Sequence, residues 1–182
     1  MIYPEYNEIQ HYPIEQTIGF TKTTSEWGIL SNFYLTPIQW NGITFDCVER
    51  LYHWFRLKNP AARKEYMTVK GGMILKMKAK TFKKNGLERH DWNEQAVDVL
   101  RFCIQLKYEQ CEEFRKALSS TGTKYIVEDQ SSRPRKTPDS WGAKYDETTN
   151  TFYGKNIMGR ILMELRDKGR LSTNIPQEYL EV

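Results

Sequence analysis

The chain has 182 residues, 39% of them hydrophobic and 27% charged, which is the composition of one ordinary soluble globular domain. The net charge of +4 fits an anionic ligand such as a phosphate ester, and the 13% of aromatic residues also suits a pocket for a planar ligand. Three dispersed cysteines exclude a disulfide framework and a Cys-x-x-Cys metal clamp, and no stretch is long and apolar enough for a membrane span, so we expect a metal-free protein of the reducing cytoplasm.

The two ends of the chain are expected to be peripheral. Residues 1–16 carry Pro4 and Pro13 among polar residues, which predicts an irregular N-terminal arm without the pattern of a signal peptide. Residues 171–182 are expected to form a C-terminal tail. The functional domain is therefore expected over residues 17–170.

The domain opens with a strand and a loop. Residues 18–21 predict the strand. Residues 27–34 interrupt apolar positions with a glycine and a Ser-Asn pair, which indicates an ordered loop. Within it, Asn32 and Phe33 either contact a ligand or form a local turn with the ring in the core.

A β-hairpin is the clearest local signal. In residues 37–45, Asn41-Gly42 separates two short β-prone runs, which predicts a two-residue hairpin with a type I′ turn. The hairpin leads directly into a helix predicted over residues 46–58.

This helix has two different faces, because positions three and four apart lie on the same side. The apolar side consists of Val48, Leu51 and Phe55. The other side carries an acid, a phenol, an imidazole and a guanidinium, which are Glu49, Tyr52, His53 and Arg56. That polar face predicts a site, although Asp46 and Glu49 also have the spacing of a capping box, in which Glu49 would be structural.

A basic helix is predicted over residues 73–83, after a shorter helix over residues 61–66. Its lysines form either a solvated face or an edge that faces phosphate, and Lys76 and Lys80 have the spacing to point together. The longest helix opens at residues 90–94, where Asp91 and Glu94 form a second candidate capping box. Its core-facing stripe is expected at Ala96, Val97, Leu100, Ile104 and Tyr108.

The last third of the chain contains a long polar segment. A helix over residues 111–118 and a strand over residues 124–128 precede it. Residues 129–153 predict a long loop, and Asp139 and Trp141 favour a functional role for it. A final helix is predicted over residues 157–167, and the Gly-Lys-Asn that precedes it indicates either an anion seat or an ordinary helix cap.

Several short motifs in a fixed order resemble one family. They are Leu30–Tyr34, Pro37-Ile38, Glu49 with Tyr52, Trp92, Lys107-Tyr108, Asp139–Gly142, Gly154–Asn156, Gly159 and Leu162–Arg166. Over residues 20–166 this set resembles the NADAR superfamily of YbiA-like N-glycosidases. The resemblance implies an α+β fold, with a single compact domain that is mostly helical and has a small β-hairpin or sheet.

The resemblance also implies an activity that needs no cofactor, the cleavage of an N-glycosidic bond to ribose. The expected substrate is an ADP-ribosylated guanine base in DNA or RNA, from which ADP-ribose is removed. The alternative is a ribosylamino-pyrimidine phosphate of early riboflavin synthesis. A non-enzymatic alternative is a module that only binds ADP-ribose or a related NAD derivative.

The chain departs from the family pattern within the expected site. Arg50 and His53 stand where the family usually has His and Gln, and Arg56 replaces a Lys. Lys80 matches the basic residue that the family has at the end of the next helix. These departures put the substrate in question more than the activity.

The chemistry of the implied reaction suggests a role for each residue. Breaking a ribosyl–nitrogen bond builds positive charge on the sugar, so a carboxylate is needed beside it, with Glu49 as the first candidate and Asp139 as the second. The expected substrate-binding residues supply hydrogen bonds, cations for phosphate and rings for a base. They are Asn32, Phe33, Tyr52, His53, Arg56, Lys80, Trp92, Trp141 and Asn156.

Overall fold

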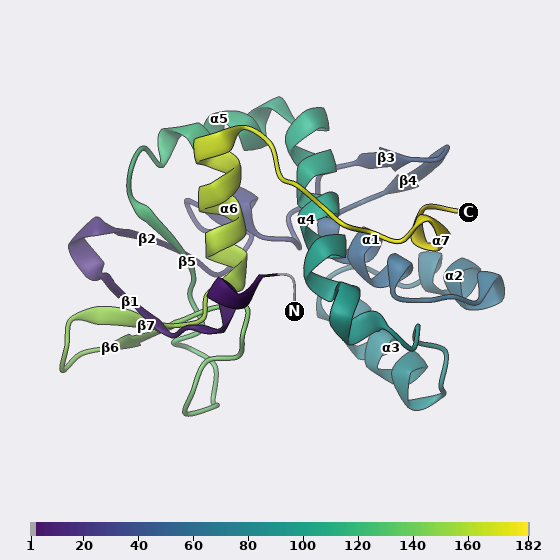
Figure 1. The fold of residues 1–182 in the computed structure, drawn as a ribbon, viewed down its shortest axis with the longest axis horizontal. Coiled ribbons are helices and arrows are strands. Elements are labelled where there is room, and N and C mark those ends of the chain that lie inside the picture. The colour runs from purple at the N-terminus through teal and green to yellow at the C-terminus, as the bar shows by residue number, and fades with distance from the viewer. Residues whose placement is uncertain (1–2, 182) are drawn as a thin grey trace. The chain divides into compact units, whose positions relative to one another are not determined.

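The computed structural model describes residues 3–181, so residues 1, 2 and 182 of the expected arm and tail lie outside the described residues. The chain divides into two compact units. Unit 1 consists of Met1–Ser31 and Glu112–Leu171, and unit 2 consists of Asn32–Cys111 and Ser172–Val182. Helices and small sheets make up both, which confirms the expected α+β fold that is mostly helical (Figure 1).

Unit 1 contains most of the strands. Its elements are η1 (Pro4–Asn7), β1 (Gln10–Pro13), η2 (Ile14–Gln16), β2 (Thr17–Phe20), η3 (Gly28–Leu30), α5 (Glu112–Ser120), β5 (Tyr125–Glu128), β6 (Lys144–Asp146), β7 (Thr151–Gly154) and α6 (Ile157–Lys168). One sheet has the order β1-β7-β6, all antiparallel, and β2 pairs with β5 in parallel. The strand at residues 10–13 replaces part of the expected irregular arm, because β7 supplies its backbone partners.

The expected loop over residues 129–153 is therefore only partly a loop. Its second half folds back as β6 and β7, joined by a turn in which Asn150 has a φ of 52°. The prediction of one long loop was wrong there, because the pairing of β7 with β1 joins segments far apart in the sequence. Residues 129–143 remain without a named strand.

Helix α6 packs against β5 in unit 1 at very close range (Figure 1). Gly159 makes this approach possible, since a Cβ at this position would overlap the carbonyl oxygen of Ile126 and the side chain of Asn156. The helix buries Ile161, Leu162 and Leu165 on the same side. A glycine is thus required here for helix–strand packing and not for a turn.

Unit 2 is built around a hairpin and helices. Its elements are β3 (Ile38–Trp40), β4 (Ile43–Phe45), α1 (Val48–Phe55), α2 (Pro60–Met67), α3 (Met73–Lys84), α4 (Trp92–Gln110) and α7 (Gln177–Leu180). The predicted hairpin is confirmed, with φ values of 44° at Asn41 and 75° at Gly42 that fit a type I′ turn. Within the described residues, no helix has the length and apolarity to cross a membrane.

Helix α1 is buried on every side, and neither predicted capping box forms. The N-cap of α1 is Cys47, and no side chain caps it. Asp46 instead accepts two hydrogen bonds from Arg50, at 2.7 and 2.8 Å. The side chain of Asp91 does not cap α4 and accepts a hydrogen bond from the hydroxyl of Tyr179 at 2.9 Å. Both predicted capping boxes were wrong, because each aspartate carboxylate binds another side chain in place of the backbone N–H groups at the start of its helix.

Helix α4 buries polar groups on its core side. Leu100 and Ile104 are buried as predicted, but Ala96, Val97 and Tyr108 are only half-buried. The core face instead includes Asp98, Arg101 and Lys107, each at most 1% exposed. Asp98 accepts a hydrogen bond from the backbone of Asn174 at 2.8 Å, and Arg101 donates to the carbonyl of Ser172 at 2.9 Å. These two bonds hold the C-terminal segment against α4.

Lys107 has the most unusual environment on this helix. Burial lowers the pKa of its ammonium group to about 7. Its Nζ lies 5.8 Å from the ring centroid of Tyr34, where the ring face attracts a cation. A lysine at this position is charged in the unfolded chain at pH 8 to 9 but largely neutral in the folded protein.

Replacing Gly159 by alanine is expected to lower the free energy of unfolding by about 1–3 kcal/mol, because α6 must move away from β5. Denaturant unfolding followed by circular dichroism measures the change. Gly71→Ala is the matched control, since its Cβ would meet Asp46 at an ordinary 3.8 Å. Equal stabilities of the two variants would contradict the close packing of α6.

Lys107 also predicts a pH dependence of stability. Between the folded pKa of about 7 and the ordinary value of 10.5, the unfolded chain binds a proton that the folded protein does not. The free energy of unfolding of the wild type should therefore rise with pH relative to Lys107→Met, by up to about 1.4 kcal/mol per pH unit. Unfolding from pH 7 to 9 tests this. Lys116→Met, at a side chain that is 75% exposed, should give a flat difference, and a flat difference for Lys107→Met would refute the shift.

Candidate functional site

A buried acid–base pair lies on α1 in unit 2. The Nε2 of His53 is 3.1 Å from the Oε1 of Glu49, one helical turn away. The two side chains are only 8% and 5% exposed. An ionised carboxylate only accepts hydrogen bonds, so the imidazole carries a proton on Nε2 and donates it to Glu49. The predicted shared face of this helix is therefore a real contact.

The carboxylate of Glu49 is held in its charged form. Burial raises the pKa of Glu49, but the hydrogen bond from His53 and the charges of His53 and Lys76 lower it further, so the net shift is downward. The pair leaves one polar atom unused, because the Nδ1 of His53 is buried without a hydrogen-bond partner among the described residues. A buried polar atom in that state is uncommon, and a catalytic role is one explanation for it.

A lysine and a phenyl ring complete the surroundings of Glu49. The Nζ of Lys76 lies 3.7 Å from the Oε1 of Glu49 and 4.9 Å from the ring centroid of Phe33. The backbone N–H of Glu49 donates to the carbonyl of Asn32 at 2.9 Å. The loop residues Asn32 and Phe33 thus lie beside the acid, as the sequence predicted for a site.

A second cluster of rings continues along the same helix. The rings of Tyr52 and Trp92 are 4.9 Å apart, and those of Tyr52 and His53 are 5.1 Å apart. Burial raises the pKa of Tyr52, so its phenol remains a hydrogen-bond donor. The guanidinium of Arg56 lies 5.8 Å from the centroid of Trp92 and forms an ion pair with Glu88. Tyr52, Arg56 and Trp92 therefore form one continuous polar and aromatic cluster with His53.

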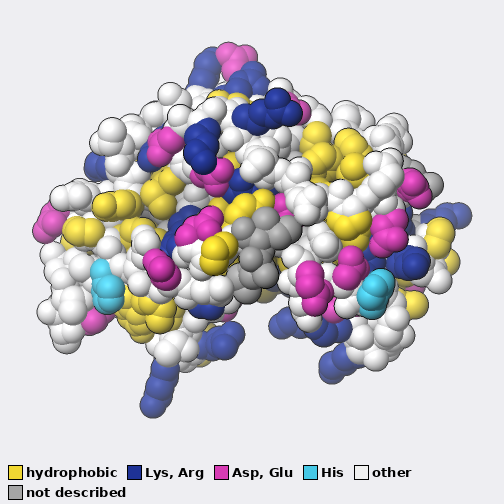
Figure 2. All heavy atoms as spheres, viewed as in Figure 1, with side chains coloured by type: hydrophobic (Ala, Val, Ile, Leu, Met, Phe, Trp, Pro, Cys, Tyr) yellow, Lys and Arg dark blue, Asp and Glu magenta, His cyan; other side chains and the backbone are white. Residues whose placement is uncertain are grey.

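The structure separates the two lysines of α3 that were expected to point together toward phosphate. Lys80 is exposed, whereas the Nζ of Lys76 lies beside the carboxylate of Glu49. Lys76 lies next to the buried stripe of Leu75, Ala79 and Phe82, and this position in the helical register was the available signal. Figure 2 shows Lys and Arg side chains that project at the lower edge of the molecule, where Figure 1 places α3.

Two further residues of unit 2 differ from the expectation. Arg50 points away from the Glu49–His53 pair, because it binds Asp46 and donates to the carbonyl of Tyr66 at 3.2 Å. Lys107 was not among the expected site residues, although its lowered pKa and burial are typical of functional lysines. The signal for Lys107 was a lysine in register with the buried Cys103 and Ile104.

The expected site residues of unit 1 form a network of their own. The carboxylate of Asp139 accepts hydrogen bonds from Gln130 at 2.6 Å, from Arg133 at 3.0 Å and from the backbone of Trp141 at 3.0 Å. Arg133 also forms an ion pair with Glu128 at 2.6 Å. These contacts show that Asp139 links parts of its own loop to one another.

The side chain of Asn156 is completely buried and bonds to the backbone of its neighbours. Its side-chain oxygen accepts from the backbone of Glu128 at 3.2 Å, and its side-chain nitrogen donates to the carbonyl of Ile126 at 2.8 Å. Carbonyl groups of Ser140 and Trp141 accept the first N–H groups of α6. Asn156 therefore clamps β5 to α6 in place of the expected substrate contact, and the start of α6 is no anion seat.

A metal site is not apparent in residues 3–181, because no group of three or more His, Cys, Asp or Glu side chains has the arrangement to hold an ion. The cysteines are also poor ligands here. Burial raises the pKa of Cys47 to about 12, and it raises that of Cys103 as well. Charge in the site thus comes from Glu49, His53, Lys76 and Arg56.

The chain is similar in sequence to several known proteins. N-glycosidase YbiA of Escherichia coli is 27% identical to the chain and matches 88% of it and 92% of its own length. The protein of the same name from Shigella flexneri is also 27% identical. A riboflavin biosynthesis protein of Vibrio vulnificus is 25% identical over 85% of the chain, which spans 39% of that longer protein.

A solved structure and a family model cover the two units together. The NMR structure of the Escherichia coli protein YbiA matches with a TM-score of 0.65 and 26% identity, over 84% of each chain. This match confirms the expected YbiA-like fold. The model of the NADAR domain matches residues 19–170, a range that contains both Glu49 and Asp139. The chain belongs to the NADAR domain family.

Proposed function

We propose that this chain acts as an N-glycosidase of the NADAR family and hydrolyses a ribosyl–nitrogen bond with Glu49 as the charge partner. One observation carries the proposal, namely the buried Glu49–His53 pair with Lys76 beside it. The names of the YbiA relatives support the class of reaction. The shared fold and the matched family domain support the transfer of that class to this chain.

Glu49 has the properties that the reaction demands. Cleavage of the bond between C1′ of ribose and nitrogen leaves positive charge on the sugar ring. A carboxylate already desolvated by the fold stabilises that charge more strongly than one in water. The lowered pKa of Glu49 keeps this carboxylate ionised at neutral pH. We therefore place the sugar ring beside Glu49, close to Lys76.

His53 is the candidate for the proton transfers. Glu49 holds Nε2, as a carboxylate does in other acid–base pairs, and Nδ1 remains without a partner among the described residues. With His53 protonated on both ring nitrogens, the leaving nitrogen receives the electron pair of the broken bond and a proton from Nδ1. Water then adds to C1′ and returns a proton to His53, so the pair is restored after each turnover.

The rings and cations beside the pair support a substrate with a base and a phosphate. Tyr52 and Trp92 form an aromatic surface for a flat base, and Phe33 supplies another ring. Arg56 lies beside the ring of Trp92, and Lys76 lies beside the ring of Phe33. Exposed Lys80 on α3 is placed one turn farther on, where it would meet a more distant phosphate.

The proposed substrate is an ADP-ribosylated guanine base in DNA or RNA, whose two phosphates suit several cations. A ribosylamino-pyrimidine phosphate is the alternative, and the name of the Vibrio vulnificus relative favours it. Both substrates share a ribose phosphate joined through nitrogen to a flat ring. The contacts of Asp139 favour a loop-ordering role, so the proposal assigns the charge partner to Glu49 alone.

Glu49→Gln is expected to slow turnover by raising the activation free energy by roughly two to four kcal/mol, because the amide cannot neutralise the charge on the sugar. The fold should survive, since glutamine keeps the shape of the side chain. Release of free base measured by mass spectrometry under single-turnover conditions gives the rate. Glu113→Gln, an exposed position on α5, is the control and should keep the wild-type rate. A Glu49→Gln rate within a factor of two of wild type would contradict the proposal.

The same assay run on several substrates separates the alternatives. ADP-ribosylated guanine in a DNA oligonucleotide should be the fastest substrate and should yield ADP-ribose and unmodified guanine. Turnover of the pyrimidine phosphates alone would establish the alternative substrate. Binding of ADP-ribose by calorimetry, with no product from any substrate, would show a binding module in place of an enzyme.

A further inference from the structure

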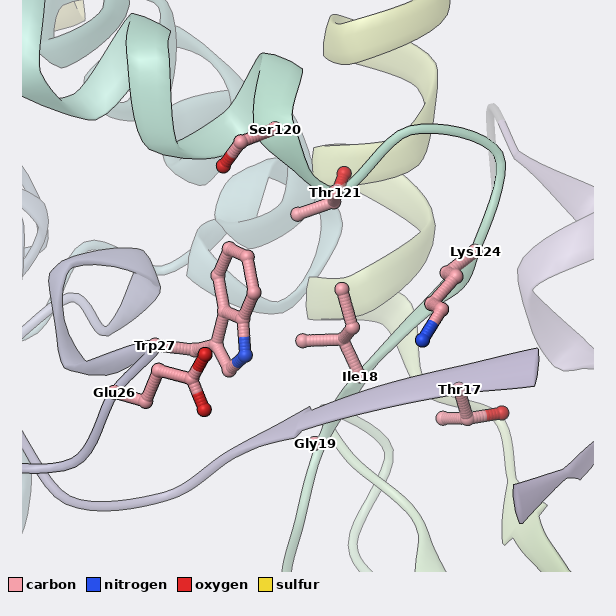
Figure 3. Close-up of a pocket in the computed structure, with 8 residues that line it drawn as sticks. All are labelled: Thr17, Ile18, Gly19, Glu26, Trp27, Ser120, Thr121 and Lys124. Atoms are coloured by element: carbon pink, nitrogen blue, oxygen red, sulfur yellow. The ribbon is translucent and has the colours of Figure 1, made fainter. Parts of the chain in front are cut away.

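A pocket in unit 1 shares no residue with the group around Glu49. It has a volume of about 460 Å³, which lies within the usual range for small-molecule sites. Strand β2, the loop before η3 and the turn after α5 form its walls (Figure 3). The side chains that matter for recognition are Ile18, Glu26, Trp27 and Lys124.

The polar groups of the pocket are available to a ligand. Across residues 3–181, the structure gives the Glu26 carboxylate, the Trp27 indole N–H and the Lys124 ammonium group no hydrogen-bond or ion-pair partner. Figure 3 shows the carboxylate of Glu26 beside the indole nitrogen of Trp27, while Lys124 extends from the other side toward Ile18. The pocket thus presents two acceptor oxygens next to one donor, with a cation opposite.

Hydrogen bonds hold the turn that carries Lys124 in place. Arg166, whose side chain is 9% exposed, donates to the hydroxyl of Thr121 at 3.1 Å and also to the carbonyl of Lys124. Thr121 in turn donates to the carbonyl of Leu118 at 2.7 Å. The turn after α5 is therefore ordered without a ligand, which reduces the entropy lost on binding.

We propose that this pocket binds a guanine mononucleotide. The edge of guanine offers two adjacent N–H donors and the O6 acceptor, which complement the carboxylate of Glu26 and the indole N–H of Trp27. The ring then lies over the buried side chain of Ile18, and the phosphate reaches Lys124. Adenine lacks the pair of donors, so it fits the same groups poorly.

The separation of the charges argues against a simpler ligand. A free aromatic amino acid carries its ammonium and carboxylate groups on one carbon atom. Glu26 and Lys124 lie on opposite sides of the pocket, so one such carbon cannot serve both. A nucleotide places its base edge and its phosphate at opposite ends, as this arrangement requires. The proposal goes beyond the hydrolysis at Glu49 and does not depend on it.

NMR of the indole N–H groups tests the proposal directly. The chain has five tryptophans, so the spectrum is simple, and Trp27→Phe identifies the resonance of Trp27. The experiment uses the full Glu49→Gln chain, in which turnover at Glu49 is strongly slowed. Guanosine monophosphate should shift the Trp27 resonance saturably, and adenosine monophosphate should need at least a tenfold higher concentration.

Variants at exposed positions complete the test, because they leave the fold intact. Glu26→Gln and Lys124→Gln should each weaken binding at least tenfold, and guanosine without phosphate should bind wild-type protein as weakly as the nucleotide binds Lys124→Gln. Glu147→Gln, exposed and outside the pocket, should bind like wild type. An unmoved Trp27 resonance, equal affinity for the two nucleotides, or unchanged affinity in both pocket variants would overturn the proposal. None of these outcomes bears on catalysis by Glu49.

Discussion

The buried hydrogen bond between Glu49 and His53 is the constraint on which the rest of unit 2 depends. Burying a carboxylate is unfavourable unless it is paired, and both of these side chains are almost wholly inside. The pair lies on α1, whose eight residues are all buried. The helix therefore has no solvent-exposed face. It is a central element, and the segments that cover it must supply partners for its polar side chains.

Those neighbouring segments supply what the pair needs. The carbonyl of Asn32 takes the backbone N–H of Glu49, and Lys76 of α3 brings a positive charge to the carboxylate. Tyr66 of α2 packs edge-on against the ring of His53 at 6.4 Å. Three different segments thus hold the pair in one geometry. Fixed, preorganised charge of this kind is what stabilises a transition state, because little reorganisation is required during the reaction.

Local patterns in the sequence were sufficient where the structure depends on local geometry. Asn41-Gly42 predicted its hairpin, and the shared face of Glu49 and His53 followed from helical spacing. Competition between partners was harder to predict. Asp46 matched the pattern of a cap, but a two-point bond with Arg50 is stronger than one bond to a backbone amide. Spacing alone does not rank these two outcomes.

Contacts between distant segments were beyond prediction from local patterns. Strand β7 forms because it pairs with β1, a distant segment of the chain, in a register that sets His11 opposite Tyr153. The choice of Lys76 over Lys80 depends on how α3 is rotated against α1. The sequence before α6 indicated a helix cap or an anion site at Asn156, yet the side-chain oxygen and nitrogen of this residue both bond to the backbone of β5. Each case needed the packed structure.

Direct measurement of the pKa of Glu49 tests the central claim that the fold holds this carboxylate ionised. Carbon-13 NMR of the glutamate carboxyl groups follows the titration, and the Glu49→Gln spectrum identifies the signal. The account predicts a pKa below the ordinary value of about 4.5 in the wild type, and a higher value when Lys76 is replaced by Met. A wild-type pKa at or above the ordinary value would contradict the account, because burial would then outweigh the stabilisation of the carboxylate by His53 and Lys76.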